Sequence, residues 1–313
     1  MTQRLASSGP RAAAPAGTAP APAAPAGDVR ARLCVVAGAV AIAFSSILVS
    51  LSHASPSTAA IFRCAYALPV LVAIAVLEDR RVGAQAWGER RYALAAGVFF
   101  AADLILWHRS IEDVGAGLST VLANIQVVLL PLVAWAVLRE RPGRRILAAL
   151  PVALLGVVLI SGALEHGAYG DNPVRGAIYG LGSGITYVAF LLLLRRSGAD
   201  LRRPAGPLRD ATAVAAVMCV IAGLVLGDAQ LVPTWPSAGW LVLLALTSQV
   251  LGWLLIAISL PRLPAASTSL LLLVQPLCAV LAAALILSEA PSSLQLVGVA
   301  LVLAALLATV RGA

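Results

Sequence analysis

Long, largely uncharged apolar runs alternate with short arginine-containing stretches along the chain from residue 33 onward. Most runs have about 17–24 residues, enough for a helix rising 1.5 Å per residue to cross a hydrocarbon core about 30 Å thick. The pattern predicts an all-α polytopic membrane protein. Ten transmembrane helices are expected, near residues 33–52, 57–77, 92–108, 115–138, 145–162, 174–194, 211–227, 240–260, 265–287 and 293–310.

Composition agrees with a lipid environment, because 60% of the residues are hydrophobic and only 12% are charged. An average soluble domain has about 25% charged residues. The net charge of +8 does not indicate a nucleic-acid partner, since every basic residue is an arginine and most lie in clusters between apolar runs. The four cysteines lie within apolar runs and lack metal-ligand spacing, so we predict no metal and no cofactor.

The arginines also predict the orientation of the chain in the membrane. With a cytoplasmic N-terminus, 19 arginines fall in cytoplasmic segments and two fall outside, with Arg63 left within a span. Cytoplasmic loops carry the excess of positive charge. We therefore expect a plasma-membrane protein with both termini in the cytoplasm. Residues 1–29 are rich in Ala, Pro and Gly and are expected to form a disordered cytoplasmic tail.

An internal repeat relates the two halves of the chain. Residues 104–140 align without gaps on 253–289, and the identical pairs include Gln126/Gln275 and Glu140/Glu289. Each half, 33–162 and 174–311, holds five predicted spans. Because five is odd, the second half would enter the membrane upside down relative to the first. Two inverted five-helix repeats are typical of secondary transporters, whose solute site lies near the membrane midplane.

Several stretches carry a family resemblance, including "DLILWHRSI" and "STVLANIQVVLLPLVAWAVLRE" in the first half and "LVQPLCAVLAAALILSE" in the second. The chain resembles ten-helix members of the drug/metabolite transporter superfamily with two EamA-type repeats. The resemblance implies a transporter fold but no particular solute, since the superfamily handles amino acids, nucleosides, sugar phosphates and drugs. One departure is that Pro276 has no counterpart at Val127, and Pro131 follows four residues later. This departure predicts that a kink in 115–138 is displaced relative to one in 265–287.

Two charged residues within the predicted spans are the main site candidates. Arg63 and Asp103 both lie five or six residues from the outer end of their helices, about 8–9 Å below the interface. Equal depth and opposite sign suggest an ion pair. The pair could tie two helices together, or Arg63 could bind an anionic group while Asp103 serves as counter-ion or proton carrier. Arg63 could also extend toward the outer surface.

Further polar and aromatic residues could line a solute pathway, although packing and interhelical hydrogen bonding explain each of them equally well. Trp107, one turn from Asp103, is either an interfacial tryptophan or a lid over an outward-facing cavity. The remaining candidates for solute binding or coupling are Tyr66, Asn124, Gln126, Tyr187, Gln249, Trp253 and Gln275. The gate candidates are Glu140 and Glu289, with salt bridging to neighbouring arginines as the alternative for Glu140.

These features predict a secondary transporter that exports a small organic solute by alternating access, with possible proton coupling. The alternatives are a uniporter or facilitator, a channel, and a membrane-embedded enzyme. An enzyme is disfavoured because the three histidines are scattered and no HExxH or GxSxG motif occurs. The expected partners are the solute, the lipid bilayer and protons, and the expected assembly is a monomer or homodimer.

Overall fold

The computed structural model describes residues 29–129, 133, 144–198, 202–259 and 271–310. The predicted tail, apart from residue 29, and the gate candidate Glu140 lie outside the described residues. The described part contains helices and no strand. The helices are α1 (Val29–Ser52), α2 (Pro56–Val82), α3 (Trp87–Val114), α4 (Ala116–Ala123), α6 (Arg144–Ile160), α7 (Pro173–Ser197), α8 (Ala205–Leu226), α9 (Ser237–Leu244), the π-helix η1 (Ala245–Gly252), α10 (Trp253–Ser259), α12 (Val274–Ile286) and α13 (Ser293–Val310).

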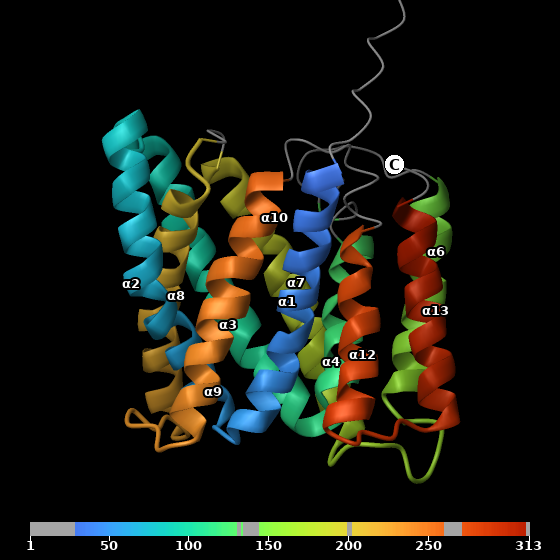
Figure 1. The fold of residues 1–313 in the computed structure, drawn as a ribbon. Helices are drawn as coiled ribbons and strands as arrows, with labels where there is room; N and C mark the ends of the chain where they lie inside the picture. The colour runs from blue at the N-terminus through green and yellow to red at the C-terminus, as the bar shows by residue number, and fades with distance from the viewer. Residues whose placement is uncertain (1–28, 130–132, 134–143, 199–201, 260–270, 311–313) are drawn as a thin grey trace, which may run out of the picture.

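Six helical segments are long and apolar enough to cross a membrane, counting α9, η1 and α10 as one segment, 237–259. Four shorter apolar helices accompany them within the described residues. All run side by side in one bundle (Figure 1). The prediction of a helical multi-pass membrane protein is thereby confirmed, whereas the count of ten spans and the inverted relation of the halves stay predictions.

Several helices begin or end beyond their predicted limits, because charged residues at their ends have partners on other helices. Helix α2 continues to Val82 rather than residue 77, and α8 begins at Ala205 rather than residue 211. The carboxylate of Glu78 accepts hydrogen bonds from the amides of Ala205 and Gly206 at the start of α8. Amides in the first turn of a helix have no acceptor within that helix, so Glu78 supplies one. Polar residues near a span end are therefore compatible with helix when a neighbouring helix satisfies them.

Pro131, on which the predicted displacement of the two kinks depends, lies outside the described residues. The first-half helix turns at Asn124 and Ile125, and the second-half helix turns at Leu273, which aligns with Asn124 at the repeat offset. At the first turn the Nδ2 atom of Asn124 donates to the carbonyl of Thr120 at 2.8 Å, and Ile125 N donates to Leu122 O with 3₁₀ spacing.

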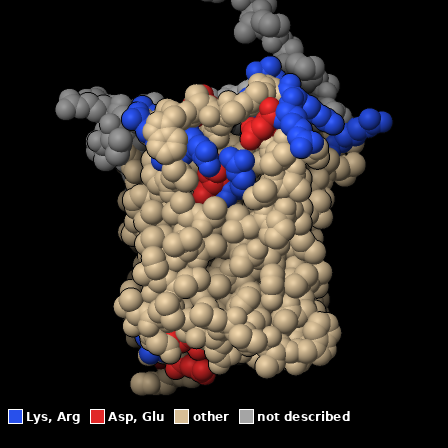
Figure 2. Space-filling view, turned by 90° about the vertical axis from the view of Figure 1, so that its left-hand side faces the viewer, with Lys and Arg blue, Asp and Glu red and all other residues tan. Residues whose placement is uncertain are grey.

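The two ends of the bundle differ in charge. Helix α1 begins and α13 ends at the same end, and Figure 2 shows that arginines gather there over α2, α3 and α8. At the opposite end, Arg109 and Arg175 each pair with an aspartate, Asp228 and Asp113 respectively. We call the two ends the arginine-rich end and the opposite end.

Candidate functional site

The guanidinium of Arg63 lies buried in the middle of the bundle, with only 3% of the residue exposed. Its Nε atom donates to Oε1 of Gln249 at 3.0 Å, and its Cζ atom lies 5.6 Å from the centroid of the Trp107 ring. Gln249 in turn donates to the hydroxyl of Thr212 at 3.2 Å. Among the described residues, the Nη1 atom of Arg63 has no hydrogen-bond partner. Buried polar groups are normally hydrogen-bonded, so this donor is an exception.

The carboxylate of Asp103 is also buried, with 6% of the residue exposed. Its Oδ1 atom accepts a hydrogen bond from the hydroxyl of Ser183 at 2.6 Å, across the α3–α7 contact. Helix α7 approaches closely because Gly180 and Gly184 face Leu122 and Ile125, and a methyl group at either glycine would collide with them. Ser183 lies between these two glycines and bonds to Asp103 of α3.

Arg63 and Asp103 interact electrostatically, but no ion pair within the described residues joins them. The predicted direct pair is therefore absent, because each group has a nearer polar partner on a helix of the other half, Gln249 and Ser183 respectively. The outward extension of Arg63 is also wrong, since its side chain is buried. Opposite charges lie close together without neutralising one another by direct contact.

Aromatic rings form one wall beside these charges. The ring centroid of Tyr187 lies 6.1 Å from that of Trp253 and 5.5 Å from that of Phe190. The ring of Phe190 stacks on that of Phe100, with 4.5 Å between their centroids. Tyr187 interacts electrostatically with both Asp103 and Arg63. The Nε1 atom of Trp253 is buried without a partner. Trp107 is buried against neighbouring helices, with 8% of the residue exposed.

The other predicted residues are less closely associated with the charges. Tyr66 packs on Phe62, with ring centroids 5.0 Å apart. Asn124 is used by its own helix, as its bond to Thr120 shows. Gln126 follows the helix break; its side chain interacts with Tyr187, while its buried Oε1 atom has no partner among the described residues. Gln275 lies in α12, which packs on α1 and α4.

At the opposite end, the gate candidate Glu289 joins the two halves of the chain. Its carboxylate accepts from the amides of Ala116 at 2.6 Å and Gly117 at 3.1 Å, at the start of α4. Burial raises the pKa of Glu289, and these two hydrogen bonds oppose the shift. The same carboxylate lines a cavity of about 580 Å³, together with Glu112 and Asp171.

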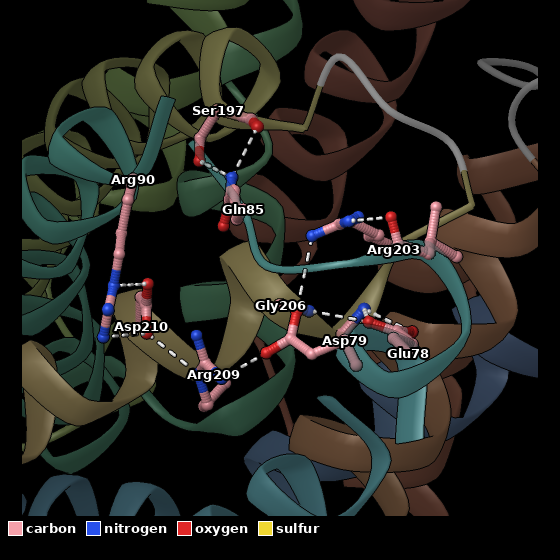
Figure 3. A network of polar contacts seen from close by, with 11 residues as sticks. Glu78, Asp79, Gln85, Arg90, Ser197, Arg203, Gly206, Arg209 and Asp210 are labelled. Carbon is pink, nitrogen blue, oxygen red and sulfur yellow. Dashed lines mark hydrogen bonds and ion pairs between the residues drawn. The ribbon is translucent and has the colours of Figure 1, made fainter. Parts of the chain in front are cut away.

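At the arginine-rich end, five charged side chains connect α2 and α3 with α8 (Figure 3). Asp210 accepts from Arg90 at 2.7 Å and from Arg209 at 2.9 Å, and Asp79 lies 3.3 Å from Arg203 and 3.5 Å from Arg209. We call these five residues the arginine–aspartate network. Asp79 and Arg90 belong to the first half of the chain, and their partners Arg203, Arg209 and Asp210 belong to the second. The network therefore joins the two halves at this end.

Sequence reasoning missed the network and two direct partners in the site. In the sequence its arginines indicate orientation in the membrane, and only Asp79 and Asp210 beside them are a sign of pairing. Ser183 and Thr212 carried no distinguishing pattern. His108 is 1% exposed because α3 continues to Val114, and its Nδ1 atom bonds to the carbonyl of Pro56 at 3.1 Å. Within the described residues, no group of three His, Cys, Asp or Glu side chains could hold a metal.

Long apolar helices around buried polar side chains define a multi-pass membrane protein. The chain belongs to the EamA-like transporter family, whose sequence pattern matches twice, over residues 29–162 and 174–311. It is therefore a membrane transporter of the drug/metabolite transporter superfamily, as the resemblance implied, and members of this family are transporters rather than enzymes.

A solved structure titled "Crystal structure of protein" is similar in fold. It has a TM-score of 0.59 and 16% sequence identity, and the match covers 89% of this chain and 95% of that chain. Because so low an identity carries information on the fold alone, no solute follows from it. None of the curated proteins matches the chain.

Proposed function

We propose that the protein is a secondary transporter that exports a small organic solute across the plasma membrane by alternating access, coupled to protons. The observation that carries the proposal is the pair of buried, unneutralised charges, Arg63 and Asp103, between the two halves of a transporter-family bundle. Intramembrane charges are costly and by default mark a solute or ion pathway. Both contact the second half, through Gln249 and Ser183.

The proposed inverted repeat is supported by which helices touch. If a two-fold axis relates the halves, α1 corresponds to α7 and α3 corresponds to the segment 237–259. The contact of α3 with α7 then requires a contact of the segment 237–259 with α1, and both are present. Likewise α4 against α7 corresponds to α12 against α1. The double match of the family pattern and the equivalent helix breaks before Gln126 and Gln275 also support the repeat. Broken helices near the midplane are typical of transporter sites.

The two ends of the molecule support alternating access. The arginine–aspartate network joins the halves at the arginine-rich end, while the cavity of about 580 Å³ lies at the opposite end. Under our proposed orientation, which the excess of arginines supports, this conformation is closed toward the cytoplasm. Export then requires the network to separate so that the solute can enter from the cytoplasm.

The chemistry of the site favours a solute with both an acidic and a basic group. The vacant Nη1 of Arg63 would bind an anionic oxygen, Asp103 would bind an ammonium group, and Tyr187 and Trp253 would contact an apolar body. We expect inside-out vesicles to accumulate a zwitterionic solute only under a proton gradient. Liposomes without protein provide the baseline. Movement without dependence on the gradient would indicate a uniporter or channel, and movement of none of the zwitterionic, cationic or anionic solutes tested would contradict the proposal.

Glu289 is expected to make transport depend on pH through its contact with α4. Its raised pKa means that it gains a proton at a higher pH than an exposed glutamate does, so the contact with Ala116 and Gly117 weakens as the pH falls. Loss of charge should weaken this contact by about 1–2 kcal/mol. Glu289→Gln should therefore behave at every pH like the wild type at low pH, in transport assays between about pH 5 and 8.

The matched control is Glu112→Gln, which neutralises an exposed carboxylate of the same cavity that makes no such contact with α4. A pH profile of Glu289→Gln identical to that of the wild type would exclude Glu289 as a gate.

A further inference from the structure

A second cavity, of about 340 Å³, lies at the arginine-rich end between α2, the residues that precede α8, and α10. Its apolar surface includes Leu77 and Ile258, which are 53% and 44% exposed. Two arginines, Arg81 and Arg202, also line it, and both are exposed. The cavity thus combines an apolar surface with positive charge at the end of the membrane-spanning helices.

One acidic residue, Glu78, also borders this cavity, but its carboxylate is already engaged. Both of its oxygens accept from the amides of Ala205 and Gly206 at the start of α8 (Figure 3). Within the described part of the chain, the guanidinium of Arg81 forms neither an ion pair nor a hydrogen bond. Its charge is therefore available to a ligand that approaches the cavity.

We propose that this cavity binds the phosphate headgroup of an anionic phospholipid from the leaflet at the arginine-rich end. Arg81 and Arg202 would contact the phosphate oxygens, while an acyl chain would lie along Leu77 and Ile258. Basic pockets between membrane helices bind acidic lipid headgroups in this manner. The exposed apolar residues select a lipid over a soluble phosphate, because only the lipid covers them.

The bound lipid would contact both halves of the chain. Arg81 and Leu77 belong to the first half, whereas Arg202 and Ile258 belong to the second. Arg202 immediately precedes Arg203 of the arginine–aspartate network. A headgroup held by both arginines therefore favours the arrangement in which this end is closed. Lipid binding itself does not depend on the proposed transport activity.

The test is native mass spectrometry of the full-length protein released from nanodiscs of phosphatidylcholine, with or without phosphatidylglycerol. We expect the wild type to retain phosphatidylglycerol, and Arg81→Gln combined with Arg202→Gln to bind it about thirtyfold more weakly. The matched control combines Arg80→Gln with Arg195→Gln, which removes two exposed arginines that do not line the cavity. The control should bind like the wild type.

Two further measurements keep the outcome decisive. Equal thermal stability of both double variants in pure phosphatidylcholine would show that the loss of lipid is not a loss of fold. Displacement of phosphatidylglycerol by inorganic phosphate would show a site for any phosphate anion and overturn the lipid assignment. Equal loss of lipid in the two double variants would show unspecific attraction to the charged end and would also overturn it.

Discussion

Asp103→Asn should abolish proton-coupled transport, with a loss of at least tenfold, while the protein still inserts and folds. Asparagine keeps an oxygen that can accept the hydrogen bond of Ser183, so the α3–α7 contact survives. Only the charge beside Arg63 disappears, and with it the group that would bind an ammonium or carry a proton. A tenfold loss corresponds to about 1.4 kcal/mol of transition-state stabilisation. Transport of a zwitterionic solute by reconstituted protein measures it.

Asp113→Asn is the matched control, because Asp113 is a second buried aspartate of the same helix. It pairs with Arg175 at the opposite end, away from the proposed site, so its loss should affect stability more than transport. A double variant separates two roles of the charges. If Arg63 and Asp103 chiefly compensate one another, replacing both with alanine should be milder than replacing either one. Full activity and an unchanged pH dependence of Asp103→Asn would exclude Asp103 as the proton carrier.

Asp210→Asn should open the arginine-rich end, because Asp210 accepts hydrogen bonds from both Arg90 and Arg209. The side chain of Asp210 is only 4% exposed. Hydrogen bonds to charged groups contribute about 1.5–3 kcal/mol, so losing the charge should raise the open population by roughly tenfold or more. The measurement is the alkylation rate of a single cysteine at Ser197, which is 1% exposed at this end, in a background without the native cysteines.

Asp228→Asn provides the comparison, since Asp228 pairs with Arg109 at 3.0 Å at the opposite end. This change should leave the labelling of the cysteine at position 197 as it is in the wild type. If Asp210→Asn also leaves the labelling rate unchanged, the arginine–aspartate network is a static contact between the halves and not a gate.

The membrane class and the family could be predicted from the sequence because both depend on local properties. Hydropathy over about 20 residues decides whether a helix can cross lipid, and stretches such as "DLILWHRSI" carry the family resemblance. Arg63 and Asp103 were identifiable for the same reason, since a charge within an apolar run stands out without knowledge of its neighbours. Asp79 and Asp210 were not, because an acid among loop arginines looks like ordinary surface charge.

The sequence by itself determined that the chain is helical, that it belongs in a membrane and that Arg63 and Asp103 need partners. Only the tertiary structure decided which residues these partners are. Gln249 lies 186 positions from Arg63 and Ser183 lies 80 from Asp103, so no periodicity along the chain connects them. Helix packing places Gln249 against Arg63 and Ser183 against Asp103, so these hydrogen bonds form in place of a direct ion pair. The two charges therefore lie close together without a direct ion pair among the described residues.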